Sequence, residues 1–436
     1  MKQSALRSIL HSFKRYVIIL LKFLLNFIPK DNNLILVSAW FGKKYIDSPK
    51  FIYEYLIEKT NYDVYWYTKD FKLFQSLKNE NKPVVYAYSL YAIWKQIRAK
   101  MLISSIQLYD FNPYFLSNCI YFDLGHGFPI KQSGFEQSDV TDKFINFELL
   151  LRKNIKYYMS ASSDWTMKIM ARCFRLSPEQ FVFSNKPRID VFFKEDLRNS
   201  KNDLLHKLKS GRKCILYMPT HRSCGTTKMH ISEIIDLKAV QEICEQYNSI
   251  FLIKKHFYHR NEIEQLDQYS RIFDISNENI DSQLLLFEAD ILISDYSASY
   301  IDYLILNRPI VFFAYDYDNF IRNERDMYLK FDDIDAGFKA VDKLQLNKTL
   351  SILCSNNFDD VFHEQGRLTI KKMYFNDEIE IGNSIETVAN QIKALLDGTF
   401  VPRWRVNKNE NTPTAQGATQ FEGRPLHGTA VVRMQD

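Results

Sequence analysis

The sequence has 436 residues, of which 46% are hydrophobic and 25% charged; this is the composition of a folded globular protein, not of a disordered chain. A chain of this length exceeds one ordinary hydrophobic core, so we expect two domains. The net charge of +5 suits an anionic ligand or membrane surface and does not indicate nucleic acid, and the six scattered cysteines indicate neither a zinc site nor a disulfide framework.

The first 30 residues contain basic side chains and no acidic one, a pattern typical of contact with an anionic membrane surface. The apolar stretch 16–28 would extend only about 20 Å as a helix, too short for a hydrocarbon core of about 30 Å, so we expect no transmembrane span. Polar residues fall on one narrow helical face. We therefore predict that residues 1–30 form an amphipathic anchor helix in the membrane interface; a helix packed on the protein's own body is the alternative.

Short β-branched or aromatic runs then alternate with helical patterns. The expected strands of the first half are 33–38, 63–67, 83–88, 101–105 and 119–124. Helical spacing of apolar residues is found between them, at 49–60 and 89–100. This alternation predicts an α/β fold with a parallel sheet, whose ligands collect at the carboxyl ends of the strands.

The same alternation restarts after a lysine-rich segment, 194–213, which we interpret as the connector. The expected strands of the second half are 214–219, 249–255, 271–275, 289–295 and 309–315, with a helical pattern at 232–247. We therefore expect an N-terminal lobe at 31–200 and a C-terminal lobe at 201–397. Residues 398–436 are polar and without period, which predicts a disordered tail.

Residues suited to phosphate chemistry follow several of these strands. His126 stands between two glycines after the run 119–124. The others, on the second half, are Thr220, Arg222, His256, Asp295, Ser297 and Ser299. Each alone is explained as simply by a surface turn, a solvated loop or a helix cap. Together they predict a cleft between two lobes for a nucleotide diphosphate.

An ordered series of segments that begins with FGKKYIDSPKFIYEYL (41–56) also carries a family resemblance. Its four most specific segments are GHGFPIKQSG (125–134), NKPRID (185–190), ILYMPTHR (215–222) and ISDYSASY (293–300). In this order the sequence resembles the CDP-glycerol glycerophosphotransferases, which make teichoic acids and related capsule polymers. The resemblance covers roughly 33–395. It implies a glycosyltransferase-B-like fold with two Rossmann-like lobes, a donor nucleotide in the C-terminal lobe and an acceptor entering from the N-terminal one. It also implies peripheral attachment to the cytoplasmic face of the bacterial cell membrane.

The resemblance implies roles for individual residues. His126 falls on the family's general base and His256 on its second essential histidine, while Ser294 and Ser297, beside Asp295, fall on its pyrophosphate-binding hydroxyls. Further contacts with substrate are expected from Gly127, Lys131, Thr220, Arg222 and Ser299.

Arg188 in the NKPRID segment has two interpretations, a contact with an anionic acceptor phosphate or a salt bridge between the lobes. The sequence departs from the family pattern at His221, Phe257 and Ala298, which leaves the choice between glycerol and ribitol open.

The predicted function is transfer of glycerol phosphate, or a related polyol phosphate, from a CDP-polyol donor to a hydroxyl of a membrane-associated, lipid-linked acceptor, with release of CMP. No acidic cluster indicates a Mg²⁺ site, so we expect no metal or other cofactor. A sugar-nucleotide glycosyltransferase of the same architecture is the nearest alternative. A catalytically inactive membrane-associated scaffold is another.

Overall fold

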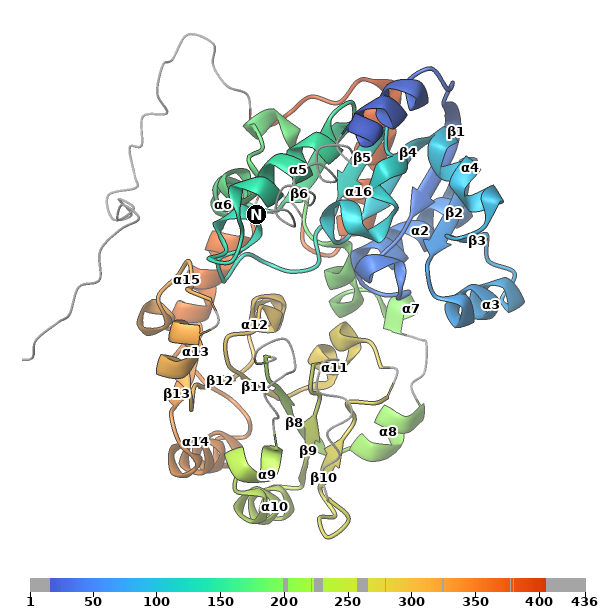
Figure 1. The fold of residues 1–436 in the computed structure, drawn as a ribbon. Coiled ribbons are helices and arrows are strands. Elements are labelled where there is room, and N and C mark those ends of the chain that lie inside the picture. The colour runs from blue at the N-terminus through green and yellow to red at the C-terminus, as the bar shows by residue number, and fades with distance from the viewer. Residues whose placement is uncertain are drawn as a thin grey trace, which may run out of the picture.

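The computed structural model describes residues 16–198, 203–220, 222, 230–256, 266–278, 280–323, 325–376, 378 and 380–404. These residues form two α/β lobes, one above the other in Figure 1, and each lobe is built round one parallel sheet. The predicted α/β class with two lobes is therefore confirmed. Parts of the predicted anchor helix and tail, 1–15 and 405–436, lie outside the described residues.

The first sheet has seven strands in the order β3-β2-β1-β4-β5-β6-β7. Its strands are β1 (Asp31–Val37), β2 (Asp63–Thr68), β3 (Val84–Tyr86), β4 (Ala99–Ser104), β5 (Ile120–Asp123), β6 (Lys156–Ala161) and β7 (Phe181–Phe183). Its helices are α2 (Asp47–Lys59), α3 (Phe71–Asn79), α4 (Leu90–Arg98), α5 (Asp142–Arg152) and α6 (Asp164–Phe174). Leu34 to Val37 of the interior strand β1 are at most 1% exposed, as expected for a parallel sheet covered on both faces.

The second sheet has six strands in the order β10-β9-β8-β11-β12-β13. Its strands are β8 (Lys213–Met218), β9 (Ser249–Ile253), β10 (Ile272–Asp274), β11 (Ile291–Ser294), β12 (Ile310–Phe313) and β13 (Phe338–Ala340). Its helices are α9 (Ile231–Ile234), α10 (Leu237–Gln246), α11 (Ser282–Glu288), α12 (Ser299–Tyr303), α13 (Tyr317–Asn323), α14 (Lys343–Ser355) and α15 (Glu364–Tyr374). Both sheets thus present the carboxyl ends of several strands to loops that carry polar residues.

The segment between the sheets contains short helices. A 3-10 helix, η6 (Pro187–Phe192), is fully buried and packs against α2 of the first lobe and α11 of the second. It is followed by α7 (Glu195–Arg198) and α8 (Asp203–Lys209), which occupy much of the lysine-rich segment predicted to connect the lobes. The contacts of η6 with both lobes make it one of the structural links between them, together with the packing of α6 against α15.

The chain returns to the first lobe at its last described helix, α16 (Ser384–Asp397). Val388 and Ile392 of this helix lie in the apolar cluster that includes Ile35 and Val37 of β1. The carboxylate of Asp190 in η6 accepts hydrogen bonds from the backbone amides at the start of α16. The helix therefore belongs to the packing of the first sheet, although the sequence prediction placed it with the second lobe.

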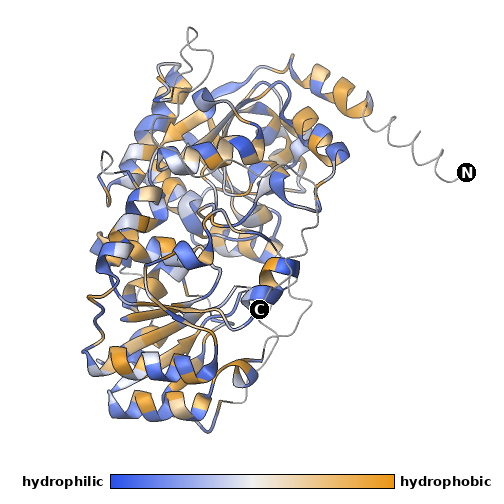
Figure 2. Ribbon diagram, turned by 90° about the vertical axis from the view of Figure 1, so that its left-hand side faces the viewer, coloured by the Kyte–Doolittle hydropathy of each residue, from blue (hydrophilic) through white to orange (hydrophobic). Residues whose placement is uncertain are grey.

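Residues 16–25 are helical and lie at the margin of the first lobe, where Figure 2 shows a mainly apolar helix. Polar residues of this segment face the protein: the Lys22 ammonium donates to the Leu116 carbonyl, and Asn26 contacts the Ser117 hydroxyl. Burial lowers the pKa of Lys22 to about 8. Large apolar side chains on the other side are open to solvent, among them Leu20, Phe23 and Phe27, which are 59%, 55% and 70% exposed.

Within the described part of the chain, no helix combines the length and hydrophobicity needed to cross a membrane.

Candidate active site

A cleft of about 1000 Å³ lies between the two lobes. Its walls come from the loops that follow strands in both sheets, including Trp40 after β1, His126 after β5, Thr220 after β8, His256 after β9 and Ser297 after β11. Ligands of parallel α/β folds bind at the carboxyl ends of strands, so this cleft is the candidate active site.

His126 is presented by a tight turn after β5. Gly125 has a φ of +65°, and a Cβ atom there would lie 3.0 Å from the Lys186 ammonium nitrogen, so the turn requires glycine. The carboxylate of Asp123 accepts a hydrogen bond from the Gly125 amide (2.8 Å) and another from the Tyr157 hydroxyl (2.7 Å). The buried Asp123 carboxylate therefore holds the turn that precedes His126.

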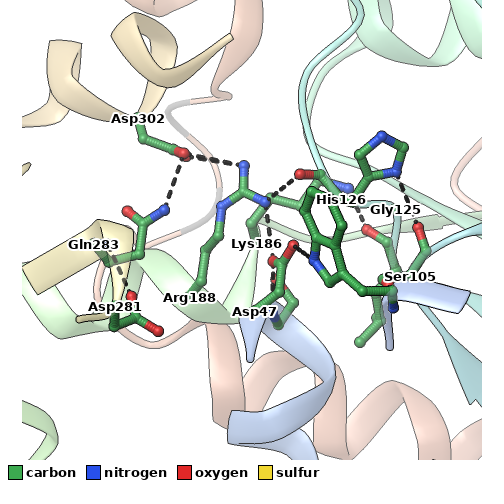
Figure 3. Close-up of polar contacts among 12 residues, drawn as sticks. Asp47, Ser105, Gly125, His126, Lys186, Arg188, Asp281, Gln283 and Asp302 are labelled. Atoms are coloured by element: carbon green, nitrogen blue, oxygen red, sulfur yellow. Dashed lines mark hydrogen bonds and ion pairs between the residues drawn. The ribbon is translucent and has the colours of Figure 1, made fainter. Parts of the chain in front are cut away.

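The imidazole of His126 is oriented by one backbone contact. Its Nδ1 lies 3.3 Å from the Ser105 carbonyl oxygen (Figure 3). Because a carbonyl oxygen only accepts, the contact places the proton on Nδ1 and leaves the Nε2 lone pair available. The side chain is open to the cleft, yet the ring lies deep between the lobes. Burial there lowers the pKa of His126 below its ordinary value of 6.5, with Asp47 partly opposing the shift. The histidine is thus neutral at pH 7 and suited to accept a proton.

The hydroxyl-rich segment of the second lobe lies directly across from His126. A Cβ atom on Gly127 would lie 3.8 Å from the Cβ of Ala298. On either side of Ala298, the Ser299 hydroxyl donates to the Ser297 hydroxyl at 3.0 Å, and both serines line the cleft. His126, Gly127, Ser297 and Ser299, predicted from separate segments, are therefore brought together.

His256 and Thr220 line the same cleft. The backbone amide of Thr220 donates to the Asp295 carboxylate at 2.9 Å, which fixes the loop after β8. Lys131, from the first lobe, also lines the cleft, with its ammonium nitrogen 5.5 Å from the centre of the Phe320 ring. Two further positions of the predicted pattern, His221 and Phe257, lie outside the described residues.

Three predicted site residues do not line the cleft. Ser294 is fully buried in β11, and its hydroxyl makes no hydrogen bond with the described residues. Arg222 and Asp295 are 5% and 1% exposed and form an ion pair of 3.0 Å. Arg222 also pairs with Asp316 at 2.7 Å and donates to the Thr220 carbonyl. The structure thus assigns Arg222 and Asp295 to holding the loop that carries Thr220.

Arg188 joins the two lobes. From η6 its guanidinium reaches Asp47 of the first lobe and Asp302 of the second, each at 3.0 Å, and donates to the His126 carbonyl at 2.8 Å (Figure 3). Of the two interpretations of Arg188, the structure shows the salt bridge between lobes. The arginine also fixes the backbone of His126.

Sequence reasoning did not single out the basic wall of the first lobe. Trp40, Lys43, Lys44 and Lys50 all line the cleft. Trp40, Lys43 and Lys44 lie in the loop after β1, and Lys50 lies in the first turn of α2. The rule that pointed to His126, a ligand site at the carboxyl end of a parallel strand, would have found the residues of this loop. No group of three or more His, Cys, Asp or Glu side chains is arranged to hold a metal ion within the described residues.

Two parallel-sheet lobes with a cleft between their strand ends form the architecture of the glycosyltransferase-B fold. The sequence matches the CDP-Glycerol:Poly(glycerophosphate) glycerophosphotransferase family over residues 20–392. The chain therefore belongs to this family, as the sequence segments predicted, and the prediction that it is an enzyme of this kind is confirmed.

Individual relatives agree with this assignment. The teichoic acid poly(glycerol phosphate) polymerase of Bacillus spizizenii is 26% identical over 332 residues, which cover 71% of this chain and 80% of that protein. The teichoic acid poly(ribitol-phosphate) polymerase of the same organism is 32% identical over 248 residues, which cover 55% of this chain and 38% of that protein. A variant of the wall teichoic acid polymerase TagF, soaked with CDPG, superimposes with a TM-score of 0.69 at 20% identity, covering 91% of this chain and 99% of that one. This last similarity confirms the glycosyltransferase-B-like fold.

Proposed function

We propose that the protein transfers glycerol phosphate, or a related polyol phosphate, from a CDP-polyol donor to a hydroxyl of a membrane-associated acceptor and releases CMP. The observation that carries this proposal is the approach of His126 and Gly127 to the Ser297–Ser299 segment, where a Cβ on Gly127 would lie 3.8 Å from Ala298. In this proposal His126 on one wall is the base, and the hydroxyls of Ser297 and Ser299 on the other wall bind the donor phosphates. Membership of the family supports the choice of donor.

In the proposed reaction the acceptor hydroxyl attacks the distal phosphorus of the donor. A bond forms between the acceptor oxygen and phosphorus, the bond from that phosphorus to the bridging oxygen breaks, and CMP leaves with the electron pair. Nε2 of His126 takes the proton of the attacking hydroxyl; general-base assistance of this kind contributes about 10²- to 10⁴-fold.

The negative charge on the leaving phosphate needs donors of the second lobe. His256 and the Ser297 hydroxyl line the cleft there and are proposed to hold the pyrophosphate, with Ser299 supporting Ser297 through its hydrogen bond. In this scheme protein groups supply the neutralising contacts, and no metal cofactor is required. The same contacts would serve CDP-glycerol and CDP-ribitol, since both donors present a pyrophosphate.

We further propose that the protein acts as a peripheral protein at the cytoplasmic face of the bacterial cell membrane, on a lipid-linked acceptor in teichoic-acid-like or capsule polymer synthesis. Support comes from residues 16–27, a helix and the turn that follows it, in which Lys22 is buried while Leu20, Phe23 and Phe27 are exposed. An apolar helix face directed to solvent is the arrangement of an interfacial anchor.

Donor choice tests the proposal. The protein is incubated with CDP-glycerol, CDP-ribitol and common UDP-sugars, each with a soluble polyol-phosphate acceptor, while release of CMP or UDP is measured. Acceptor-dependent CMP release from a CDP-polyol is expected. Release of UDP without CMP would favour the sugar-nucleotide glycosyltransferase, and release of neither would favour the inactive scaffold.

A further inference from the structure

The chain leaves β1 through three consecutive residues with positive φ: Trp40 at 51°, Phe41 at 61° and Gly42 at 75°. Residues with side chains rarely adopt this left-handed conformation, and they keep it only where surrounding structure enforces it. The buried carboxylate of Asp110 accepts hydrogen bonds from the amides of Phe41 (2.6 Å) and Ser105 (2.7 Å). Hydrogen bonds thus hold a strained turn at residues 40–42 beside the candidate active site. We infer that the side chain placed by this turn has a function.

The turn presents Trp40 to His126. The two ring centroids lie 5.6 Å apart with an interplanar angle of 67°. Both residues use the same anchor, because the Ser105 hydroxyl accepts from the Trp40 amide at 3.0 Å and the Ser105 carbonyl contacts His126. The indole N–H donates to the Asp47 carboxylate at 3.2 Å. Trp40 is therefore fixed next to the proposed base, on the acceptor side of the cleft.

Beyond Trp40 the same wall carries three lysines, Lys43, Lys44 and Lys50. The ammonium nitrogen of Lys44 lies 4.9 Å from the centre of a Trp40 ring, and that of Lys50 lies 5.3 Å from the centre of Phe51. Lys43 and Lys50 form no ion pair with any described residue. Their charges are available to a ligand in the cleft.

Most of the carboxylates near these lysines are engaged by other groups. Asp47 pairs with Arg188, Asp70 caps α3, and Glu80 pairs with Lys82 at 3.1 Å. On the opposite wall Asp281 caps α11 and also interacts electrostatically with Lys50. The first-lobe wall beside His126 therefore has an excess of positive charge, which attracts an anion.

We propose that Lys43, Lys44 and Lys50 form a subsite for the phosphate group of the acceptor's terminal polyol-phosphate unit, and that Trp40 separates this subsite from His126. This inference rests on the proposed function. The proposed function leaves the chemistry of the acceptor open, and the subsite specifies it. An acceptor that ends in a polyol phosphate carries its nearest anionic phosphate one polyol away from the attacking hydroxyl. Lysine ammonium groups bind such phosphates as point charges, and holding the phosphate orients the hydroxyl toward Nε2 of His126.

The test compares two soluble acceptors with the same terminal diol, one joined through a phosphodiester and one through an uncharged linkage. CDP-glycerol is the donor, and the full-length Lys43→Gln/Lys50→Gln variant is compared with wild type. We expect the variant to raise KM for the phosphodiester acceptor about tenfold or more, while KM for CDP-glycerol and the reaction of the uncharged acceptor change less than about twofold. Lys72→Gln, at an exposed lysine of the same lobe outside the cleft, is the matched control and should resemble wild type.

Each other outcome contradicts the subsite. Equal losses with both acceptors would show that the lysines do not recognise phosphate, and a raised KM for CDP-glycerol would assign them to the donor. An unchanged variant would remove them from binding altogether. Failure of the proposed function would look different from failure of the subsite, because wild-type protein would then release no CMP from CDP-glycerol with either acceptor. Melting temperatures of all variants exclude misfolding as the cause of a loss.

Discussion

The rings of Trp40 and His126 form a T-shaped contact, with centroids 5.6 Å apart, although the two residues follow different strands of the first sheet. Ser105, at the end of β4, contacts both of them. Because β4 lies between β1 and β5 in the sheet, three adjacent strand ends cooperate to position one imidazole. The geometry of the proposed base thus follows from strand order.

Replacement of the proposed base is the first prediction. His126→Ala should lower turnover with CDP-glycerol by about 10²-fold or more, because the acceptor hydroxyl loses its proton acceptor. Donor affinity and melting temperature should change little, since the side chain is open to the cleft. His206→Ala, at an exposed histidine on α8 outside the cleft, is the matched control. Near-normal turnover of folded His126→Ala would end the assignment.

The acidity of His126 gives a second prediction. Burial in the cleft lowers the pKa of this imidazole below 6.5, while Asp47 raises it and Arg188 lowers it further. A general base works when neutral, so kcat/KM should be independent of pH from about 7 upward until other groups titrate. It should decline in acid with a midpoint below about 6.5. A pH profile of kcat/KM measures this, and an acid limb centred above neutrality would contradict it.

The two kinds of serine in the SDYSAS segment give a third prediction. Ser297→Ala should raise KM for CDP-glycerol or lower turnover by roughly three- to tenfold, the effect of one lost hydrogen bond of about 0.5–1.5 kcal/mol. Ser294→Ala is the control from the same segment, because its hydroxyl is buried in β11 and faces no ligand. Steady-state kinetics separate the two. If Ser294→Ala impaired donor use more than Ser297→Ala, the cleft-lining assignment would be wrong.

Arg188 gives a prediction about stability. Arg188→Met removes the cation between Asp47 and Asp302 and leaves two buried carboxylates unpaired, which should cost about 3–5 kcal/mol. Arg172→Met is the control: its ion pair with Glu136 joins side chains that are 63% and 23% exposed, and such pairs contribute about 0–1 kcal/mol. Chemical denaturation followed by circular dichroism compares the variants. Equal stability of Arg188→Met and wild type would show that the bridge does not hold the lobes.

Most of the fold was predictable because parallel strands have a strong local pattern. Each run expected to form a strand overlaps an observed one. Three of the described strands, β6, β7 and β13, had no prediction. β7 and β13 have only three residues each and carry no usable period, whereas β6 is a six-residue aromatic and apolar run that the sequence analysis missed. The predicted helix 232–247 is interrupted because the side chain of Asp236 caps a new helix, α10, by accepting from the Ala239 amide.

The site was less predictable, since the sequence shows which residues end a strand but not what they face. Arg188 finds its partners 141 and 114 residues away along the chain, and no local pattern encodes such distances. Arg222 follows a strand as His126 does, yet its guanidinium turns inward to Asp295 and Asp316. Whether a charged side chain at a strand end contacts a ligand or forms an internal ion pair depends on how the residues round it pack. That packing depends on the whole fold.

The final prediction concerns the membrane. Phe23 and Phe27 are 55% and 70% exposed on the helical segment beside the first lobe, so they are placed to enter a lipid interface. Phe23→Glu/Phe27→Glu should weaken sedimentation with anionic vesicles by about 10²-fold or more, because each buried phenylalanine contributes roughly 1.5–3 kcal/mol. Phe362→Glu, at an apolar residue of the second lobe that is 78% exposed, is the control and should bind vesicles normally.

Activity separates anchoring from chemistry in the same variants. The double variant should react slowly with a lipid-linked acceptor, whose local concentration the anchor raises, and normally with a short soluble one. High salt should weaken vesicle binding of the wild type only in part, since salt screens the basic residues but not the apolar contacts. Wild-type vesicle binding by Phe23→Glu/Phe27→Glu would show that this helix face is not the anchor, and the exposed apolar residues of α4, including Leu90 and Trp94, would be the next surface to test.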